Sequence, residues 1–173
     1  MALWLIPEPT FLAPFHSVIR ELSVTLGGPV FTPHVTLLSR ITGTLSSATG
    51  LTAHLARMMP SFEVSISRVA HSAEASRAVF LELSYAGGLR DARKDAESLF
   101  PHHAPTPFSP HLSLPYGDVD QAQAEAACLS IMDRVPRRFV VGALELIRAS
   151  SASRVQTWRR LRTFTLEDAR SGE

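Results

Sequence analysis

Two histidine-containing pentapeptides are the stretches of this sequence whose residue types could carry chemistry. Residues 33–37 read Pro-His-Val-Thr-Leu and residues 110–114 read Pro-His-Leu-Ser-Leu, so each histidine precedes a hydroxyl residue by two positions. Side chains alternate between the faces of an extended strand, so each histidine shares a face with its hydroxyl while the apolar residues face the core. Two such strands brought together would place two imidazoles and two hydroxyls around one site.

That set of side chains suits metal-free cleavage of a phosphodiester. The reaction needs a base for the attacking oxygen and an acid for the leaving oxygen, and imidazole can serve in either role near neutral pH. His34 and His111 are therefore the candidate catalytic residues. The hydroxyls of Thr36 and Ser113 would donate to the non-bridging phosphoryl oxygens and hold the phosphorus between the two rings.

Simpler interpretations of these histidines have to be compared with the catalytic one. The histidine of a single His-x-Thr sequence is more often a strand residue with satisfied hydrogen bonds and no chemical role. Two copies with the same flanking proline and leucine instead favour a catalytic role. His102 and His103, together with His111, could suggest a metal site. No Asp or Glu lies between them, and exposed histidines before a proline are usually solvated, so we predict no metal.

The overall composition is that of a globular protein with a small anionic substrate. The 173 residues are 45% hydrophobic with a formal net charge of +1, whereas duplex binding normally requires a marked basic excess. Cys128 is the only cysteine, which excludes an intramolecular disulfide and is compatible with a reducing compartment. No apolar run approaches the roughly 18 residues that a membrane span needs. We expect a cytoplasmic protein.

The elements that must position the two histidines follow a repeated order. After a first strand over residues 2–6, hydrophobic periodicity predicts helix, histidine strand, helix, strand and strand over about 14–84, and the same five elements over about 88–166. The predicted fold is α+β: a single domain, 1–173, made of two pseudo-symmetric lobes. Two antiparallel sheets would face each other across a central cleft, with the helices on the outside, and clefts of this kind hold ligands.

Three local predictions concern the helices. Pro14 is placed in the first turn of the first helix, where a missing N–H is tolerated. Ser46 or Ser47 is predicted to cap the second helix. Leu129 and Met132 are predicted to face the core from the fourth helix.

Paired His-x-Thr/Ser motifs on the strands of a duplicated α+β unit resemble the two-histidine phosphoesterase superfamily, and the resemblance covers the whole chain. Leu3-Trp4 and the stretches 31–37 and 109–117 are most similar to the plant and fungal cyclic phosphodiesterases. The resemblance implies opening of ADP-ribose 1″,2″-cyclic phosphate to the 1″-phosphate, which clears a by-product of tRNA splicing. It also implies slower opening of nucleoside 2′,3′-cyclic phosphates to 2′-phosphates, without a metal or other cofactor.

The resemblance also implies roles for individual residues. His34 and His111 match the catalytic histidines, Thr36 and Ser113 match the phosphate-binding hydroxyls, and Tyr116 matches an aromatic that lies against the base or ribose. We interpret His111 as the base that activates water and His34 as the acid at the leaving ribose oxygen, and the near-symmetry of the site leaves the reverse assignment open.

Further aromatic and basic residues have two interpretations each. Phe80 and Trp158 resemble family aromatics that could wall the cleft, but either could equally be a core residue. Arg159, Arg160 and Arg162 could touch a diphosphate or simply cover a sheet face.

Two other functions stay open at this stage. A related enzyme acting on RNA 2′,3′-cyclic phosphate ends would fit poorly with the near-neutral charge and the single lysine, Lys94. A non-catalytic nucleotide- or RNA-binding module would not need two imidazoles aimed at one point. We therefore expect a small cyclic nucleotide as the partner, no stable nucleic-acid complex, no membrane association and a monomeric protein.

Overall fold

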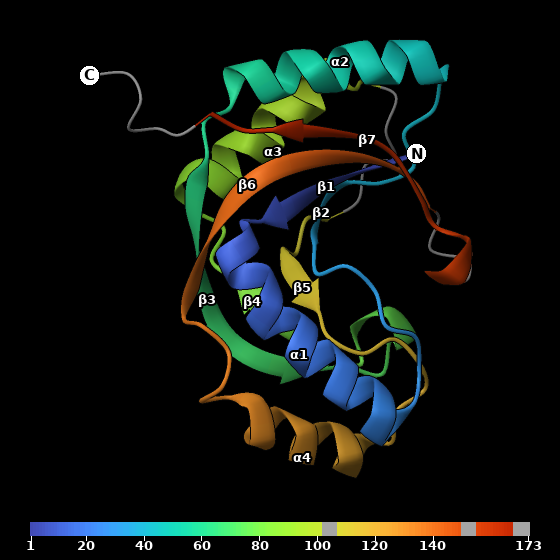
Figure 1. Cartoon of the computed structure of the whole chain (residues 1–173), viewed down its shortest axis with the longest axis vertical. Coiled ribbons are helices and arrows are strands. Elements are labelled where there is room, and N and C mark those ends of the chain that lie inside the picture. The colour runs from blue at the N-terminus through green and yellow to red at the C-terminus, as the bar shows by residue number, and fades with distance from the viewer. Residues whose placement is uncertain (102–106, 150–154, 168–173) are drawn as a thin grey trace.

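The computed structural model describes residues 1–101, 107–149 and 155–167 (Figure 1). After the first strand, the order helix, strand, helix, strand, strand occurs twice. The elements are β1 (Ala2–Pro7), α1 (Pro9–Leu26), β2 (Val35–Leu38), α2 (Leu45–Met58), β3 (Phe62–His71), β4 (Val79–Leu83), α3 (Gly87–Leu99), β5 (His111–Ser113), α4 (Gln121–Ile131), β6 (Arg138–Arg148) and β7 (Arg159–Thr165), with 3-10 turns η1 (Ala75–Arg77) and η2 (Val155–Thr157).

The strands form one antiparallel sheet that closes into a ring. The hydrogen-bonded order is β1-β2-β5-β4-β3-β6, β6 pairs again with β1, and β7 lies along β6. The 11-residue β6 closes the ring because its first part pairs with β3 and the remainder with β1. The two predicted sheets are thus joined through β6 and through the β2–β5 pair, and the helices lie outside them (Figure 1). The α+β prediction is confirmed.

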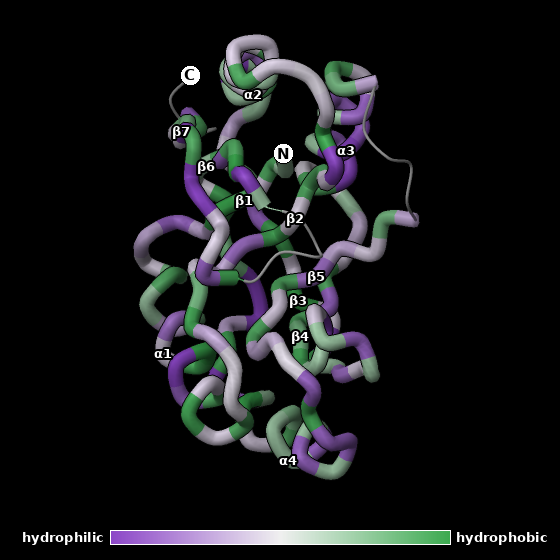
Figure 2. The backbone as a smooth tube through the Cα atoms, turned by 90° about the vertical axis from the view of Figure 1, so that its right-hand side faces the viewer, coloured by the Kyte–Doolittle hydropathy of each residue, from purple (hydrophilic) through white to green (hydrophobic). Residues whose placement is uncertain are grey.

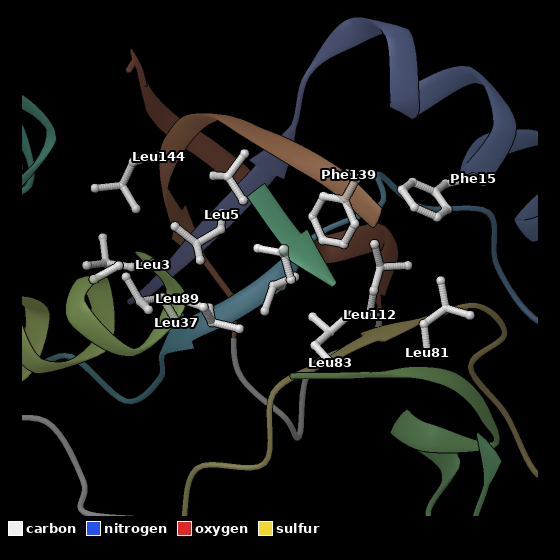
Figure 3. Packing of buried hydrophobic residues seen from close by; sticks show 14 of the residues in the cluster. Leu3, Leu5, Phe15, Leu37, Leu81, Leu83, Leu89, Leu112, Phe139 and Leu144 are labelled. Carbon is white, nitrogen blue, oxygen red and sulfur yellow. The ribbon is translucent and has the colours of Figure 1, made fainter. Parts of the chain in front are cut away.

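Leucines and phenylalanines from opposite parts of the chain fill the main core. Phe15 on α1 and Phe139 on β6 are fully buried and meet edge to face, with ring centroids 5.5 Å apart. Leucines of β1, β2, β4, β5 and α3 belong to the same cluster and extend it away from this pair (Figure 3). Each such leucine contributes about 1.5–3 kcal/mol through burial. Hydrophilic residues gather instead on the outer helices, most clearly α3 (Figure 2).

Two helix starts differ from the predictions. Helix α1 begins at Pro9, so Pro14 lies inside the helix and not in its first turn. The missing N–H of Pro14 leaves one helical hydrogen bond unmade, which the packing of the helix on the sheet must offset. Helix α2 is capped by Thr44, whose Oγ1 accepts a hydrogen bond from the Ser47 N–H at 3.2 Å.

No helix of the described segments has the length and apolarity needed to cross a membrane.

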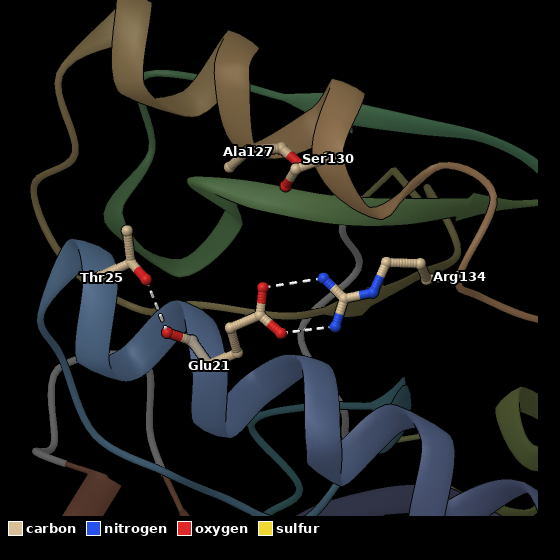
Figure 4. A network of polar contacts seen from close by, with 5 residues as sticks. All are labelled: Glu21, Thr25, Ala127, Ser130 and Arg134. Carbon is tan, nitrogen blue, oxygen red and sulfur yellow. Dashed lines mark hydrogen bonds and ion pairs between the residues drawn. The ribbon is translucent and has the colours of Figure 1, made fainter.

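Helix α4 packs with a different face from the predicted one. Its buried residues are Ala124, Ala127 and Ile131. Leu129 and Met132 are exposed, so their predicted place in the core is wrong. Small alanines let the helix approach its neighbours closely, and Arg134 just beyond it forms a bidentate ion pair with Glu21 on α1 (Figure 4). This exposed pair links the end of α4 to α1 and contributes little stability.

Candidate active site

His34 lies immediately before β2 in a buried position. Its ring stacks on the indole of Trp4 from β1, with ring centroids 3.5 Å apart and planes 13° from parallel. Nδ1 lies 2.7 Å from the Thr32 carbonyl oxygen, and a carbonyl can only accept, so we assign the proton to Nδ1 and the lone pair to Nε2. Burial lowers the pKa of His34 to about 4, although the Thr32 carbonyl acts in the opposite direction. His34 is therefore neutral at physiological pH.

His111, the first residue of β5, repeats this arrangement. Its Nδ1 lies 2.8 Å from the Ser109 carbonyl oxygen, which fixes the same tautomer with a basic Nε2. Phe80 meets the imidazole edge to face at 5.8 Å. Burial lowers the pKa of His111; the Ser109 carbonyl raises it, the Arg77 guanidinium lowers it further and Glu74 raises it. Both histidines thus present an unprotonated Nε2 in the free protein.

The strands that carry the histidines are direct neighbours, paired through Val35 and Leu112. Extending this antiparallel register by one residue on each side places Thr36 opposite His111 and His34 opposite Ser113. Directly opposed residues have Cβ atoms about 5 Å apart. Each histidine therefore faces the hydroxyl residue of the other copy. Val35 and Leu112, on the opposite face, are fully buried in the core.

The two hydroxyls have different surroundings. Thr36 borders the cavity at this site, and its hydroxyl has no hydrogen-bond partner among the described residues. Ser113 is buried, does not border the cavity, and its Oγ donates to the Ser76 carbonyl oxygen at 2.8 Å. Burial raises the pKa of the Tyr116 phenol, and the neighbouring Ser113 hydroxyl acts in the opposite direction. Thr36 is thus available to a ligand at once, whereas Ser113 would have to leave Ser76.

A cavity of about 1140 Å³ opens in front of the histidines. Tyr116 and Trp158 border it, and their rings meet at 5.5 Å. Trp4 borders it too, while Phe31 packs edge to face on Tyr116 at 4.6 Å. The sequence interpretation did not single out Trp4 as a wall residue or Phe31 as a residue that packs behind the wall. Two features could have identified them. Both residues lie in the stretches that resemble the family, and Trp4 pairs with Thr36 across β1–β2 and so shares its face.

Of its two interpretations, cleft wall or core residue, Phe80 has the core position. The side chain is 4% exposed and does not border the cavity. It lies between His111 and Arg77, whose guanidinium carbon is 4.3 Å from the Phe80 ring centroid. Strand β4 pairs with β5 so that Phe80 is opposite Ser113, which explains this position. Phe80 therefore supports His111 from within the protein.

The arginines near Trp158 lie away from the cavity. Arg159 and Arg162 donate to backbone carbonyls of their own segment, and Arg160 pairs with the buried Glu145 at 3.4 Å. None of the three borders the cavity, in contrast to Arg40, which sequence interpretation missed. Concerning metals, the described segments contain no group of three potential ligands, and the His102-His103 pair lies outside them.

The sequence profile of the 2'-5' RNA ligase superfamily matches residues 19–152, which include both histidine strands. The chain belongs to this superfamily. The predicted two-histidine phosphoesterase family is thereby confirmed, and with it an enzyme of the phosphodiesterase class. The cyclic phosphodiesterase of Arabidopsis thaliana is 24% identical over 126 residues, which cover 73% of this chain and 70% of the plant protein.

Solved structures share the fold of this superfamily member along nearly its whole length. A phosphoesterase crystal structure has a TM-score of 0.62 at 18% identity, covering 96% of this chain and 99% of its own. Escherichia coli LigT, in complex with ATP, has a TM-score of 0.59 at 17% identity, with coverages of 96% and 98%. A Thermus thermophilus protein, TT0787, has a TM-score of 0.59 at 20% identity, with coverages of 98% and 100%. At these identities the likeness concerns the fold alone.

Proposed function

We propose that this protein is a metal-independent cyclic phosphodiesterase of small nucleotides. Its substrates would be ADP-ribose 1″,2″-cyclic phosphate, opened to ADP-ribose 1″-phosphate, and nucleoside 2′,3′-cyclic phosphates, opened to 2′-phosphates. The observation that carries the proposal is the register of β2 and β5, which sets two tautomerically matched imidazoles and the Thr36 hydroxyl on one face. A purely binding site would not need two basic Nε2 atoms at one point.

The reaction requires a proton to leave water and a proton to reach the ribose oxygen. In the proposed mechanism His111 Nε2 takes a proton from water as the water oxygen bonds to phosphorus. The bond from phosphorus to the leaving ribose oxygen breaks, and protonated His34 gives that oxygen its Nε2 proton. Thr36 donates to a non-bridging oxygen, where negative charge increases in the transition state. The carbonyls of Thr32 and Ser109 keep both rings oriented throughout.

The neighbours of the two rings support this division of roles. The Arg77 charge disfavours protonation of His111, which suits a base. The Trp4 ring face lies directly against His34 and stabilises an imidazolium through its π-electrons, which suits an acid. Burial opposes protonation of His34 in the free protein. An anionic phosphate bound between the rings supplies the countercharge, so His34 gains its proton together with the substrate.

The nucleotide class of substrate is supported by the walls of the site and by relatives. Tyr116 and Trp158 offer aromatic surfaces to a base or ribose at the cavity edge. LigT of Escherichia coli has been crystallised with ATP and with 3'-AMP, so a protein of this fold can hold a nucleotide.

The test is a turnover assay with three substrates in the presence of a chelator. Purified protein is incubated with ADP-ribose 1″,2″-cyclic phosphate, with adenosine 2′,3′-cyclic phosphate and with an RNA that ends in a 2′,3′-cyclic phosphate, and products are identified by phosphorus NMR. We expect turnover of the two small substrates, with 2′-phosphate from the nucleoside. The control His54→Ala changes an exposed histidine of α2 and should behave as wild type. Preference for the RNA, or no turnover of any substrate, would contradict the proposal.

A further inference from the structure

We propose that Arg40 is a specificity-determining residue that binds a second phosphoryl group of the substrate, beyond the cyclic phosphate held between His34 and His111. The second group would lie on the far side of the same ribose, as in a nucleoside diphosphate derivative or a 5′-phosphorylated nucleotide. This assignment rests on the proposed function for the position of the reacting phosphate.

The charges around the cavity identify Arg40 first. Among the described residues that border the cavity, Arg40 is the only one whose side chain carries a permanent charge, and neither Asp nor Glu is among them. Its side chain is exposed and has no ion pair or hydrogen bond within the described segments. A guanidinium that faces a cavity without a carboxylate is available to bind a phosphate through two parallel hydrogen bonds.

The backbone of Arg40 is shaped to turn its side chain toward that cavity. Its φ is 55°, and no other non-glycine residue in the described segments has a positive φ. Leu3 pairs with Leu38, so a regular ladder would next place Arg40 opposite Met1. Instead the Ile41 N–H donates to the Met1 carbonyl oxygen at 2.9 Å, which makes Arg40 the extra residue of a β-bulge.

The bulge changes which side chains face the cavity. Strict alternation after the buried Leu38 would put Ser39 on the cavity face, Arg40 in the core and Ile41 on the cavity face. With the extra residue, Ser39 and Arg40 both border the cavity, and Ile41 is buried with 5% exposure. A left-handed arginine is unfavourable, and such conformations concentrate at functional sites. Here the left-handed conformation of Arg40 keeps Ile41 buried in the core and places a cation at the cavity edge.

The distances and the volume fit a substrate with two phosphoryl groups. Arg40 follows Thr36 by four residues, which span at most about 14 Å, and the long arginine side chain shortens the remaining gap. The cavity of about 1140 Å³ is slightly larger than typical ligand sites, which measure about 300–1,000 Å³. A cavity of this size has room for a nucleoside cyclic phosphate and a second phosphoryl group.

Direct binding of product-like ligands tests the assignment without requiring turnover. Calorimetry at about 0.1 M ionic strength compares adenosine 2′-phosphate with adenosine 2′,5′-bisphosphate on wild type and on Arg40→Asn, because Asn accepts a left-handed backbone. We expect wild type to bind the bisphosphate about 10- to 100-fold more tightly than adenosine 2′-phosphate, because Arg40 would form charge-assisted hydrogen bonds with the 5′-phosphate. In Arg40→Asn this ratio should fall close to one, and Arg40→Lys should retain part of it.

Matched controls separate charge from folding. Arg57→Gln removes the same charge from an exposed position at the end of α2 and should keep the wild-type ratio. Arg40→Gly, which also tolerates a positive φ, should reproduce Arg40→Asn if the guanidinium is the cause. Equal affinity of wild type for both ligands, or an unchanged ratio in both Arg40 variants, would overturn the assignment.

The same variants distinguish this proposal from the proposed function. If the affinity ratio collapses in Arg40→Asn but wild type opens no cyclic phosphate, the Arg40 assignment stands and the catalytic proposal fails. If cyclic phosphates are opened but Arg40→Asn keeps the wild-type ratio, the catalytic proposal stands and the Arg40 assignment fails. When both hold, Arg40→Asn should raise KM for ADP-ribose 1″,2″-cyclic phosphate far more than KM for adenosine 2′,3′-cyclic phosphate.

Discussion

Thr36 lies opposite His111 across the β2–β5 pair, because Val35 and Leu112 are register partners. The hydroxyl proposed to bind phosphate in one repeat therefore lies opposite the imidazole of the other. This crossing means that neither repeat contains a complete site. It also explains why a substrate phosphate would contact both halves of the ring at once.

Loss of either histidine should remove most of the activity, and a modified leaving group should distinguish their roles. We expect His34→Ala and His111→Ala each to lower kcat/KM by about 10²- to 10⁴-fold. A substrate with sulfur in place of the leaving ribose oxygen departs as a thiolate and needs no acid. On it His34→Ala should recover most of the wild-type rate, whereas His111→Ala should not. Recovery by His111→Ala instead would reverse the assignment of acid and base.

Stability should depend on pH through His34. Burial lowers its pKa to about 4 in the folded protein, against about 6.5 in the unfolded chain, so the unfolded state binds the proton more tightly. The folded protein is therefore unaffected above about pH 6.5 and loses up to about 3 kcal/mol as the pH falls toward 4. Urea unfolding of wild type and His34→Asn across this interval measures the difference. If the free energy of unfolding changed with pH in the same way for both proteins, His34 would not be buried in its neutral form.

The hydroxyls should contribute unequally to catalysis. Thr36→Val removes a free donor without changing the side-chain shape, and we expect kcat to fall about 10²-fold. Ser113→Ala should lower kcat less, because Ser113 must give up its bond to the Ser76 carbonyl before it can reach a phosphate. Ser113→Ala should also lower the free energy of unfolding by about 1 kcal/mol. Steady-state kinetics and chemical denaturation of both variants check this, and equal losses of kcat would contradict the difference.

Gly28 should be required for the position of Tyr116. A Cβ at Gly28, where φ is 96°, would lie 2.2 Å from the Tyr116 carbonyl oxygen. Gly27 also has a positive φ of 77° but nothing within 4 Å of its Cβ position, so Gly27→Ala is a matched control for backbone strain alone. We expect Gly27→Ala to cost about 1 kcal/mol and Gly28→Ala distinctly more, with a raised KM. Thermal unfolding and kinetics measure both, and equal behaviour of the two variants would argue against the close contact.

The local sequence was sufficient for the order of the elements and for the choice of the candidate catalytic pair. Period-2 alternation in residues 33–37 and 110–114 predicts strands that hold a histidine and a hydroxyl on one face, and the structure places Thr36 and His111 on the face that borders the cavity. The order of elements was predictable because their hydrophobic periodicity is strong. Helix α4 was the exception, since its alanines leave little contrast between faces, and Leu129 and Met132 were assigned to the wrong one.

By itself, then, the sequence determined which residues could do the chemistry and which strands carry them, because both follow from neighbours along the chain. The tertiary structure decided the crossed pairing of Thr36 with His111, the stack of Trp4 on His34, the place of Phe80 behind His111 and the bulge that exposes Arg40. Register and bulges depend on which strands meet and on what the core must bury. Those are contacts between distant residues, and no local pattern encodes them.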